Sequence, residues 1–345
     1  MPIIEGSSLK NYKYRDNVFS FEGCVSVQET SDWISPWRIE YDRADFYPFL
    51  SQIGSYKWSA PVGAQCSGVR ICFSTDADTV MLELQNVIEG LKLDLYVNNC
   101  FSEELVMDGH TNTATFKDLN SNFKKIEIWL DQRHAFYLRN IWINKDAKIC
   151  KTRITQRRWI HYGSSISHSR EASTPSGIWT SIVARKLDLY LTNLGFAANC
   201  VIEPMIGRLI RDLPADFITL KLGINVHRRL TRRNFATNVI GFVQTIREKH
   251  TDTPLAIISP ILSPSREKMK VIEDGLSLEE MRENLYNVVE SCKKYGDRNI
   301  YYVDGLRIFG QDELKYLPDG LHPNAEGQEV FADKFIKEVF ESFPA

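Results

Sequence analysis

The sequence predicts an antiparallel β-sandwich followed by a doubly wound α/β domain. Its 345 residues exceed the length at which a single hydrophobic core usually stops growing, so two domains are expected. Residues 1–150 show the alternation of half-buried strands and almost no helical pattern, whereas residues 151–345 alternate apolar runs with helical periodicity. We therefore predict domains at 1–150 and 151–345, with the charged stretch 145–158 as their junction.

Composition and charge narrow the class of protein. With 43% hydrophobic and 25% charged residues, the chain has the make-up of an ordinary globular protein. A formal net charge of −2 gives no electrostatic reason to expect a nucleic acid or a membrane as a partner. The amino terminus lacks the basic start and apolar core of a secretory signal, and no stretch resembles a membrane span. We therefore expect a cytoplasmic protein with reduced cysteines, and the sequence does not predict its oligomeric state.

The first half carries short strand patterns separated by turn-rich pieces. Leu91, Leu93 and Leu95 alternate with polar or aromatic neighbours, as the residues of a half-buried strand do. Closely spaced strands of this kind favour an antiparallel sandwich with jelly-roll character. The expected strands cover residues 69–74, 79–84, 91–97, 125–130 and 136–143.

Four aromatic side chains in this half have two possible roles. They could line a sugar-binding face or the cleft of the second domain, or they could fill the sandwich interior, which is the commoner use of aromatic residues. The sequence leaves both interpretations open. The four residues are Trp33, Trp37, Tyr56 and Trp58.

The second half predicts a flavodoxin-like, five-stranded parallel sheet. Its strand candidates are close to continuous apolar runs, as expected for strands that helices cover on both faces. A capping box at Ser277 and Glu280 precedes one helical pattern, and a last helix is expected to begin near Asn324. The expected strands cover residues 158–162, 187–194, 216–222, 255–259 and 299–303.

Polar blocks stand where these strands end. Gly163-Ser-Ser-Ile-Ser167 follows the first strand, the block 193–199 ends the second, and Gly223-Ile-Asn225 follows the third. A further block, Asp319-Gly-Leu-His322, precedes the last helix. In open α/β sheets ligands bind at the carboxyl ends of the strands. A serine hydroxyl becomes a good nucleophile when a histidine accepts its proton and a carboxylate orients that histidine, so these blocks contain the components of a serine hydrolase.

In order and spacing, the four blocks resemble those of the SGNH hydrolases, also called GDSL-type esterases and lipases. The resemblance spans residues 158–341. It implies that Ser165 is the nucleophile, His322 the general base and Asp319 the carboxylate that orients the imidazole. It also implies an oxyanion hole built from the Ser165 amide, the backbone N–H of Ala198 and the side chain of Asn225. Apart from the resemblance, the other histidines show no metal-ligand spacing and no stretch resembles a zinc or calcium motif, so we expect no metal ion and no cofactor.

The chain departs from the family pattern at several positions. Ala198 stands where the family usually has glycine, and the nearest glycine, Gly195, lies three residues earlier. Ser164 replaces the aspartate that usually precedes the nucleophile, and Val226 replaces the aspartate that often follows the oxyanion asparagine. A backbone N–H survives a change from glycine to alanine, so the hole can form if the local φ angle suits alanine. These changes put substrate preference in doubt more than catalysis.

Two further features could contact a substrate. Gly195 and His168 could line the cleft, although a histidine that starts a helix is the more ordinary reading of His168. The basic run 227–233 could meet an anionic substrate or an acyl carrier, although such runs are usually solvated.

Three functions fit these observations. The first is a serine esterase that cleaves a small acyl ester of a carbohydrate or another hydroxylated compound. The second is an acyltransferase that passes the acyl group to a sugar or natural-product hydroxyl, because a β-sandwich ahead of an SGNH domain resembles both carbohydrate esterases and acyltransferases of the family. The third is a non-catalytic carbohydrate-binding protein, which the altered residues Ser164 and Ala198 alone favour.

Overall fold

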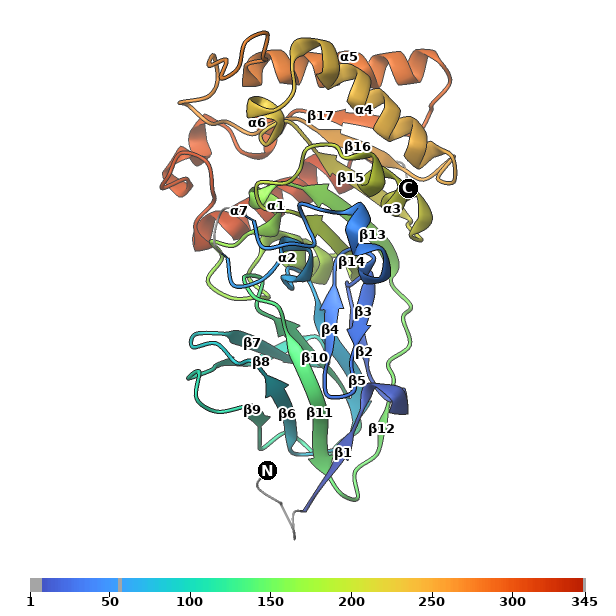
Figure 1. The fold of residues 1–345 in the computed structure, drawn as a ribbon, viewed down its shortest axis with the longest axis vertical. Coiled ribbons are helices and arrows are strands. Elements are labelled where there is room, and N and C mark those ends of the chain that lie inside the picture. The colour runs from blue at the N-terminus through green and yellow to red at the C-terminus, as the bar shows by residue number, and fades with distance from the viewer. Residues whose placement is uncertain (1–7, 55–57, 344–345) are drawn as a thin grey trace. The chain divides into compact units, whose positions relative to one another are not determined.

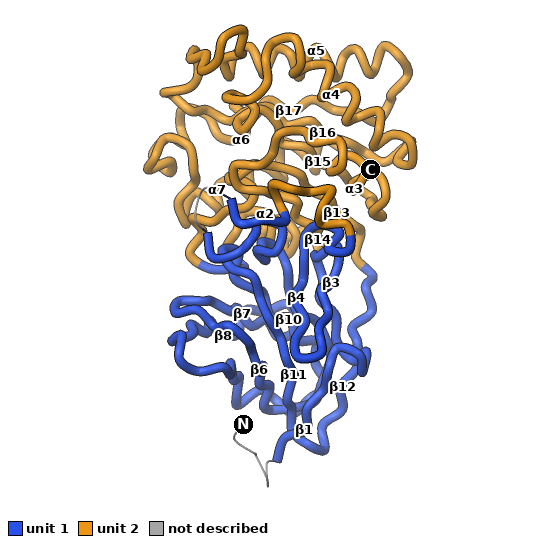
Figure 2. Tube along the Cα trace, in the orientation of Figure 1, with its two compact units in different colours: residues 1–42, 51–155, 174–176 blue, residues 43–50, 156–173, 177–345 orange. Residues whose placement is uncertain are grey.

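The structure of the protein is a computed structural model that describes residues 8–54 and 58–343. The chain forms two compact units. Unit 1 comprises residues 1–42, 51–155 and 174–176, and unit 2 comprises residues 43–50, 156–173 and 177–345 (Figure 2). Residues 43–50 thus belong to unit 2 although they lie within the first half of the sequence, and residues 174–176 belong to unit 1 although they lie within the second half. Tyr56 lies outside the described residues.

Unit 1 contains two antiparallel sheets, as predicted. One sheet has the order β3-β4-β11-β6-β9, with β1 paired to β11, and the other has the order β12-β5-β10-β7-β8, with β2 paired to β5 (Figure 1). The strands are β1 (Leu9–Tyr12), β2 (Ser20–Glu22), β3 (Ser26–Glu29), β4 (Ile34–Trp37), β5 (Arg70–Thr75), β6 (Val80–Gln85), β7 (Lys92–Val97), β8 (Cys100–Val106), β9 (Thr113–Phe116), β10 (Lys124–Leu130), β11 (Tyr137–Asn144) and β12 (Ile149–Cys150).

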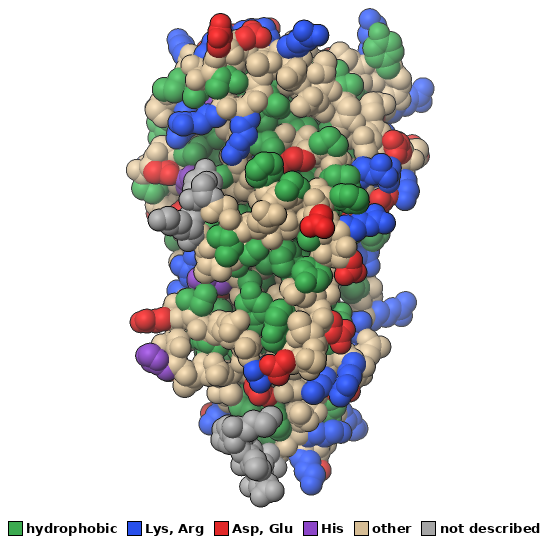
Figure 3. Space-filling view, in the orientation of Figure 1, with side chains coloured by type: hydrophobic (Ala, Val, Ile, Leu, Met, Phe, Trp, Pro, Cys, Tyr) green, Lys and Arg blue, Asp and Glu red, His purple; other side chains and the backbone are tan. Residues whose placement is uncertain are grey.

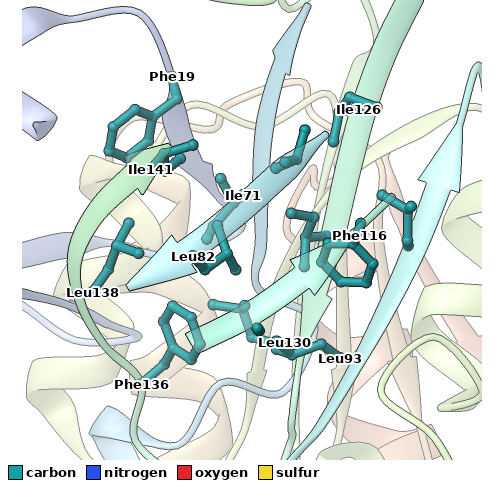
Figure 4. Packing of buried hydrophobic residues seen from close by; sticks show 14 of the residues in the cluster. Phe19, Ile71, Leu82, Leu93, Phe116, Ile126, Leu130, Phe136, Leu138 and Ile141 are labelled. Atoms are coloured by element: carbon teal, nitrogen blue, oxygen red, sulfur yellow. The ribbon is translucent and has the colours of Figure 1, made fainter. Parts of the chain in front are cut away.

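The core of unit 1 lies between these sheets. Leu82 of β6 and Leu138 of β11 come from one sheet, Ile71 of β5 and Ile126 of β10 come from the other, and all four are fully buried in one cluster (Figure 4). Their strands match the predicted ones to within a residue or two. The five predicted ranges do not include β1 to β4, β8, β9 or β12. In β8 the side chains are mostly exposed or half-buried and show no apolar alternation, so burial left no pattern to read.

The aromatic residues of unit 1 divide between the core and its rim. Trp37 is buried, and its indole Nε1–H donates to Gln28 Oε1 at 3.1 Å. Trp33 is half-buried and packs edge-on against Tyr137, with ring centroids 4.9 Å apart, while Trp58 is also half-buried. A sugar-binding role for these side chains stays a prediction.

Unit 2 contains the five-stranded parallel sheet that the sequence predicted. Its order is β14-β13-β15-β16-β17, so the chain moves from β13 to one side and then returns across β13 to the other. This reversal is the topological switch point at which flavodoxin-like folds bind their ligands. The strands are β13 (Arg157–Gly163), β14 (Leu189–Gly195), β15 (Phe217–Lys221), β16 (Leu255–Ile258) and β17 (Ile300–Val303).

Helices connect these strands. Within unit 2, α2 packs on α7, while α4 packs on both α3 and α5. The predicted capping box starts α5, since Ser277 Oγ accepts the Glu280 N–H at 3.2 Å and Glu280 Oε2 accepts the Ser277 N–H at 2.9 Å. The α-helices are α1 (Ser165–His168), α2 (Trp179–Lys186), α3 (Pro204–Asp212), α4 (Arg232–Arg247), α5 (Leu278–Lys294), α6 (Gly305–Ile308) and α7 (Ala325–Phe335). The other helical turns are η1 (Tyr14–Asp16), η2 (Tyr41–Phe46), η3 (Val62–Ala64), η4 (Val226–Arg228), η5 (Gln311–Tyr316) and η6 (Ile336–Phe340).

The described surface has mixed character. Basic and acidic side chains are interspersed over the face drawn in Figure 3, as a net charge of −2 leads one to expect. Among residues 8–54 and 58–343, no helix combines the length and the apolar character needed to cross a bilayer. The cytoplasmic location stays a prediction.

Candidate active site

The nucleophile candidate stands at the end of the strand next to the switch point. β13 ends at Gly163, Ser164 caps the short helix α1 by accepting the Ile166 N–H at 3.4 Å, and Ser165 is the first residue of that helix. A Cβ on Gly163 would lie 2.2 Å from Ser167 Oγ. Because α1 folds back tightly onto the strand, there is no room for a side chain at this position. Glycine is therefore required for steric reasons.

Ser165, His322 and Asp319 come together as the sequence predicted. Ser165 Oγ lies 2.7 Å from His322 Nε2, although the two residues are 157 positions apart in the chain. His322 Nδ1 lies 2.6 Å from Asp319 Oδ2. A carboxylate can only accept, so Nδ1 carries the proton, and Nε2 is left free to accept the hydroxyl of Ser165.

The loop that carries Asp319 and His322 is held by its own carboxylate. Asp319 Oδ1 accepts the backbone N–H of His322 at 2.7 Å and that of Leu321 at 2.9 Å. Gly320 between them has φ of 73°, a left-handed conformation that suits glycine. Partial burial acts to raise the pKa of Asp319, but the hydrogen bonds from His322 outweigh burial and leave that pKa below its ordinary value. Asp319 is thus ionised at neutral pH and can stabilise a protonated His322.

A second serine and histidine pair lies beneath the first. Ser167 Oγ is 2.7 Å from His161 Nε2, and His161 Nδ1 is 2.8 Å from Thr219 Oγ1. Trp159 donates its indole N–H to the same threonine oxygen at 2.8 Å. All four side chains are buried. This set links β13, α1 and β15, so it supports the helix that carries Ser165.

His161 is held in its neutral form. Burial and, after it, the charge of Lys221 place the pKa of His161 well below its ordinary value. Lys221 is itself buried, and burial lowers the pKa of its ammonium group to about 8. This pair was not predicted from the sequence. The available signal was that Trp159 and His161 share one face of an otherwise apolar strand.

The two remaining oxyanion candidates follow the strands on either side of β13. Ala198 lies after β14 and Asn225 after β15. Asn225 Oδ1 accepts the backbone N–H of Cys200 at 3.0 Å, so the Nδ2 group points away from that contact as a donor. Ala198 has φ of 60°, in the left-handed region that costs an L-residue about 1–2 kcal/mol relative to glycine. Alanine therefore occupies the conformation for which the family's usual glycine is suited, at an energetic cost.

Gly195 and His168 are both buried. His168 is fully buried, and its Nδ1 accepts the Ala197 N–H at 3.3 Å. Gly195 is buried too, and a Cβ there would lie 2.6 Å from the backbone of Ser167 and His168. Both residues pack α1 against the end of β14, and glycine allows the close approach at position 195 because it has no side chain. A role for either residue in binding substrate stays a prediction.

The structure describes no metal centre: no cluster of three or more His, Cys, Asp or Glu residues within 8–54 and 58–343 could hold a metal ion.

Comparison with protein families finds two matches. Residues 156–340 match the model of the GDSL-like lipase/acylhydrolase family, and residues 19–139 match the model of the SsfX3 N-terminal domain. The candidate catalytic groups all fall within the first of these matches. A search of the curated proteins found no match.

Solved structures of both esterases and an acyltransferase resemble the chain. A salicylyl-acyltransferase, SsfX3 from a tetracycline biosynthetic pathway, is 32% identical, with a TM-score of 0.87 and 98% of each chain covered. A Bacteroides ovatus protein that carries the name GDSL-like lipase is 20% identical, with a TM-score of 0.74 and coverage of 98% of this chain and 100% of that chain. A family two carbohydrate esterase from Cellvibrio japonicus is 12% identical, with a TM-score of 0.66 and coverage of 96% and 97%. At their level of identity the last two show the shared fold alone.

Proposed function

Because the chain belongs to the GDSL-like lipase/acylhydrolase family, we propose that it is a serine esterase that cleaves a small acyl ester through an acyl-enzyme on Ser165. The observation that carries the proposal is the continuous set of contacts from Ser165 Oγ through His322 to Asp319. The arrangement has the roles and the geometry of a serine hydrolase triad.

The first half-reaction forms the acyl-enzyme. His322 Nε2 accepts the proton of Ser165 as Oγ attacks the ester carbonyl carbon, and Asp319 stabilises the imidazolium that results. The N–H groups of Ser165 and Ala198 and the amide of Asn225 stabilise the oxyanion. His322 then gives its proton to the leaving alcohol oxygen, and the bond between that oxygen and the acyl carbon breaks. Water completes hydrolysis by the same steps and restores the Ser165 hydroxyl.

An acyltransferase is the second candidate. In this version an organic hydroxyl replaces water, loses its proton to His322 and takes the acyl group from Ser165. The likeness to a salicylyl-acyltransferase over nearly the whole of both chains favours this candidate, as does the match of residues 19–139 to an N-terminal domain of the same name. A carbohydrate or natural-product hydroxyl is the acceptor class that we propose.

A non-catalytic carbohydrate-binding protein is the third candidate, and the geometry speaks against it. Ser164 acts as the helix cap in place of the family's aspartate, so that change costs no catalytic group. Ala198 keeps its backbone N–H.

One experiment separates these candidates. The protein is incubated with a panel of aryl esters of increasing acyl length, with and without alcohol and sugar acceptors, and both the products and the intact protein are weighed by mass spectrometry. An esterase gives free acid at a rate that acceptors leave unchanged, whereas an acyltransferase gives acylated acceptor at the expense of acid. If no ester yields an acyl adduct or product, the catalytic proposal fails and the binding protein gains support.

We also propose that residues 1–150 shape access to the ester while residues 151–345 carry the chemistry. All the candidate groups lie beyond residue 158. A truncation is a poor test, because residues 43–50 belong to unit 2. Trp33→Ala is a better one: activity on a small aryl ester should stay within about twofold, and only activity on a sugar ester should fall. Equal losses on both esters would contradict this division.

A further inference from the structure

Arg229 joins the two loops that carry the oxyanion candidates. Its Nη1 donates to the carbonyl oxygen of Ala198 at 2.7 Å and to that of Asn225 at 3.3 Å. One guanidinium nitrogen carries two hydrogens, so a single group can satisfy both carbonyls. Arg229 follows the short turn η4 and is exposed, as is the contact that it makes.

The Ala198 loop needs such a contact because its backbone is costly. Ala198 takes a left-handed φ of 60°. For an L-residue this conformation is about 5- to 30-fold less favourable than for glycine. The Arg229 hydrogen bond is charge-assisted and is made to the carbonyl of the strained residue itself, so it favours the left-handed turn over alternatives that would turn that carbonyl away.

The Asn225 side is fixed in the same small set of contacts. Asn225 Oδ1 accepts the Cys200 N–H at 3.0 Å, two residues beyond Ala198. Together with Arg229, this bond ties the two loops at both ends of residues 198–200. An oxyanion hole works when its donors are held in place before the reaction, so a tie between its two loops acts directly on its performance.

We propose that Arg229 is a positioning residue that holds Ala198 in its left-handed conformation and fixes it to Asn225, and so compensates for alanine at a position suited to glycine. This inference rests on the proposed function, since it assumes that Ala198 and Asn225 act in the oxyanion hole. It assigns Arg229 no contact with the reacting atoms.

The main test is a double-mutant cycle between Arg229→Ala and Ala198→Gly, measured on a small uncharged aryl ester. In the Ala198 background, Arg229→Ala should lower kcat by about 5- to 30-fold and leave KM within about threefold, because the turn and not substrate binding is lost. In the Ala198→Gly background the same change should cost less than about threefold, because glycine holds the turn without help.

Matched variants exclude other roles for Arg229. Arg228→Ala removes a neighbouring exposed arginine of the same basic run and should stay within twofold of wild type. Urea denaturation of each variant checks that it folds, and added guanidinium ion should restore part of the Arg229→Ala kcat. An equal loss in both Ala198 backgrounds would refute the inference, as would a change confined to KM, which would make Arg229 a substrate-binding group.

The outcome for Arg229 is separable from the outcome for the proposed function. Ser165→Ala is measured in parallel on the same ester. If Ser165→Ala is inactive and Arg229→Ala behaves like wild type, the inference fails while the esterase stands. If Ser165→Ala keeps full activity, the proposed function itself fails.

Discussion

The chain contains two serine–histidine pairs whose serines, Ser165 and Ser167, are two positions apart. The pairs share the same oxygen-to-nitrogen distance but differ in burial and in the partner of the histidine. Ser165 with His322 and Ser167 with His161 both have an oxygen-to-nitrogen separation of 2.7 Å. The second pair is fully buried, whereas Ser165 is partly exposed and 23% of the His322 side-chain surface is exposed to solvent. A short contact alone therefore does not identify a nucleophile.

The partners of the two histidines explain the difference. His322 faces the Asp319 carboxylate, which stabilises the imidazolium formed when the serine proton is taken. His161 faces the neutral hydroxyl of Thr219, with Lys221 near enough to oppose a positive charge. The surroundings favour the protonated form of the first histidine and disfavour that of the second. We therefore propose a chemical role for the first pair and a supporting role for the second.

The largest expected effect separates the two serines by activity. Ser165→Ala should lower kcat by about 10⁴-fold or more, because it removes the attacking atom, whereas Ser167→Ala should retain activity to within about tenfold. Rates on an aryl ester and labelling by a sulfonyl fluoride measure both. Labelling that persists in Ser165→Ala but vanishes in Ser167→Ala would reverse our assignment of the two pairs.

An oxyanion donor should matter only to the reactive pair. Asn225→Ala should lower kcat by about 10²- to 10³-fold with KM little changed, which is roughly 3–4 kcal/mol of transition-state stabilisation. Asn225→Asp should be slower still, because a carboxylate repels the developing negative charge. Steady-state kinetics measure both, with Val226→Ala as a neighbouring control. A near-normal kcat for Asn225→Ala would mean that other groups build the hole.

Stability should rank the two serines in the opposite order. Ser167→Ala leaves His161 Nε2 buried without its partner, which should cost about 1–3 kcal/mol of unfolding free energy. Ser165→Ala changes a partly exposed side chain and should stay within about 0.5 kcal/mol. Urea denaturation compares them. Equal midpoints for the two variants would show that the buried pair does not support the fold.

The smallest expected effect is a pH dependence that belongs to the buried pair. The pKa of His161 lies well below its ordinary value of 6.5 in the folded state. Below pH 6.5, His161 is therefore protonated in the unfolded state but stays neutral in the folded state. Stability is therefore complete above that pH and falls as pH drops below it, by at most about 1.4 kcal/mol per pH unit from this group. His161→Gln should lose less stability between pH 7 and pH 5 than wild type does. An identical loss in both proteins would show that His161 takes up its proton normally.

Much of the architecture could be read from the chain because the relevant patterns are local. Five continuous apolar runs correspond to β13 to β17, and the alternation at residues 91–97 corresponds to β7. The contacts between Ser165, Asp319 and His322 could be predicted because each residue sits in a short block and the blocks resemble those of a known family in order and spacing. The predicted ranges did not include β1 to β4, β8, β9 or β12. In β8 most residues are exposed, so burial left no apolar pattern on that strand.

Other features depend on the meeting of segments far apart in the chain. The sequence near His161 and Ser167 does not show that their side chains form a hydrogen bond. The bond forms because α1 folds back over Gly163, which has no side chain to obstruct it. The sequence left open whether His168 and Gly195 line the cleft, and in the structure the packing of α1 against β14 buries both. The left-handed backbone of Ala198 and its hydrogen bond from Arg229 also cannot be read from residue types. Residue identity and spacing determine which chemical groups this protein has. Strand order and backbone dihedral angles determine which of those groups meet, because residues far apart in the sequence come into contact only when the sheet is packed.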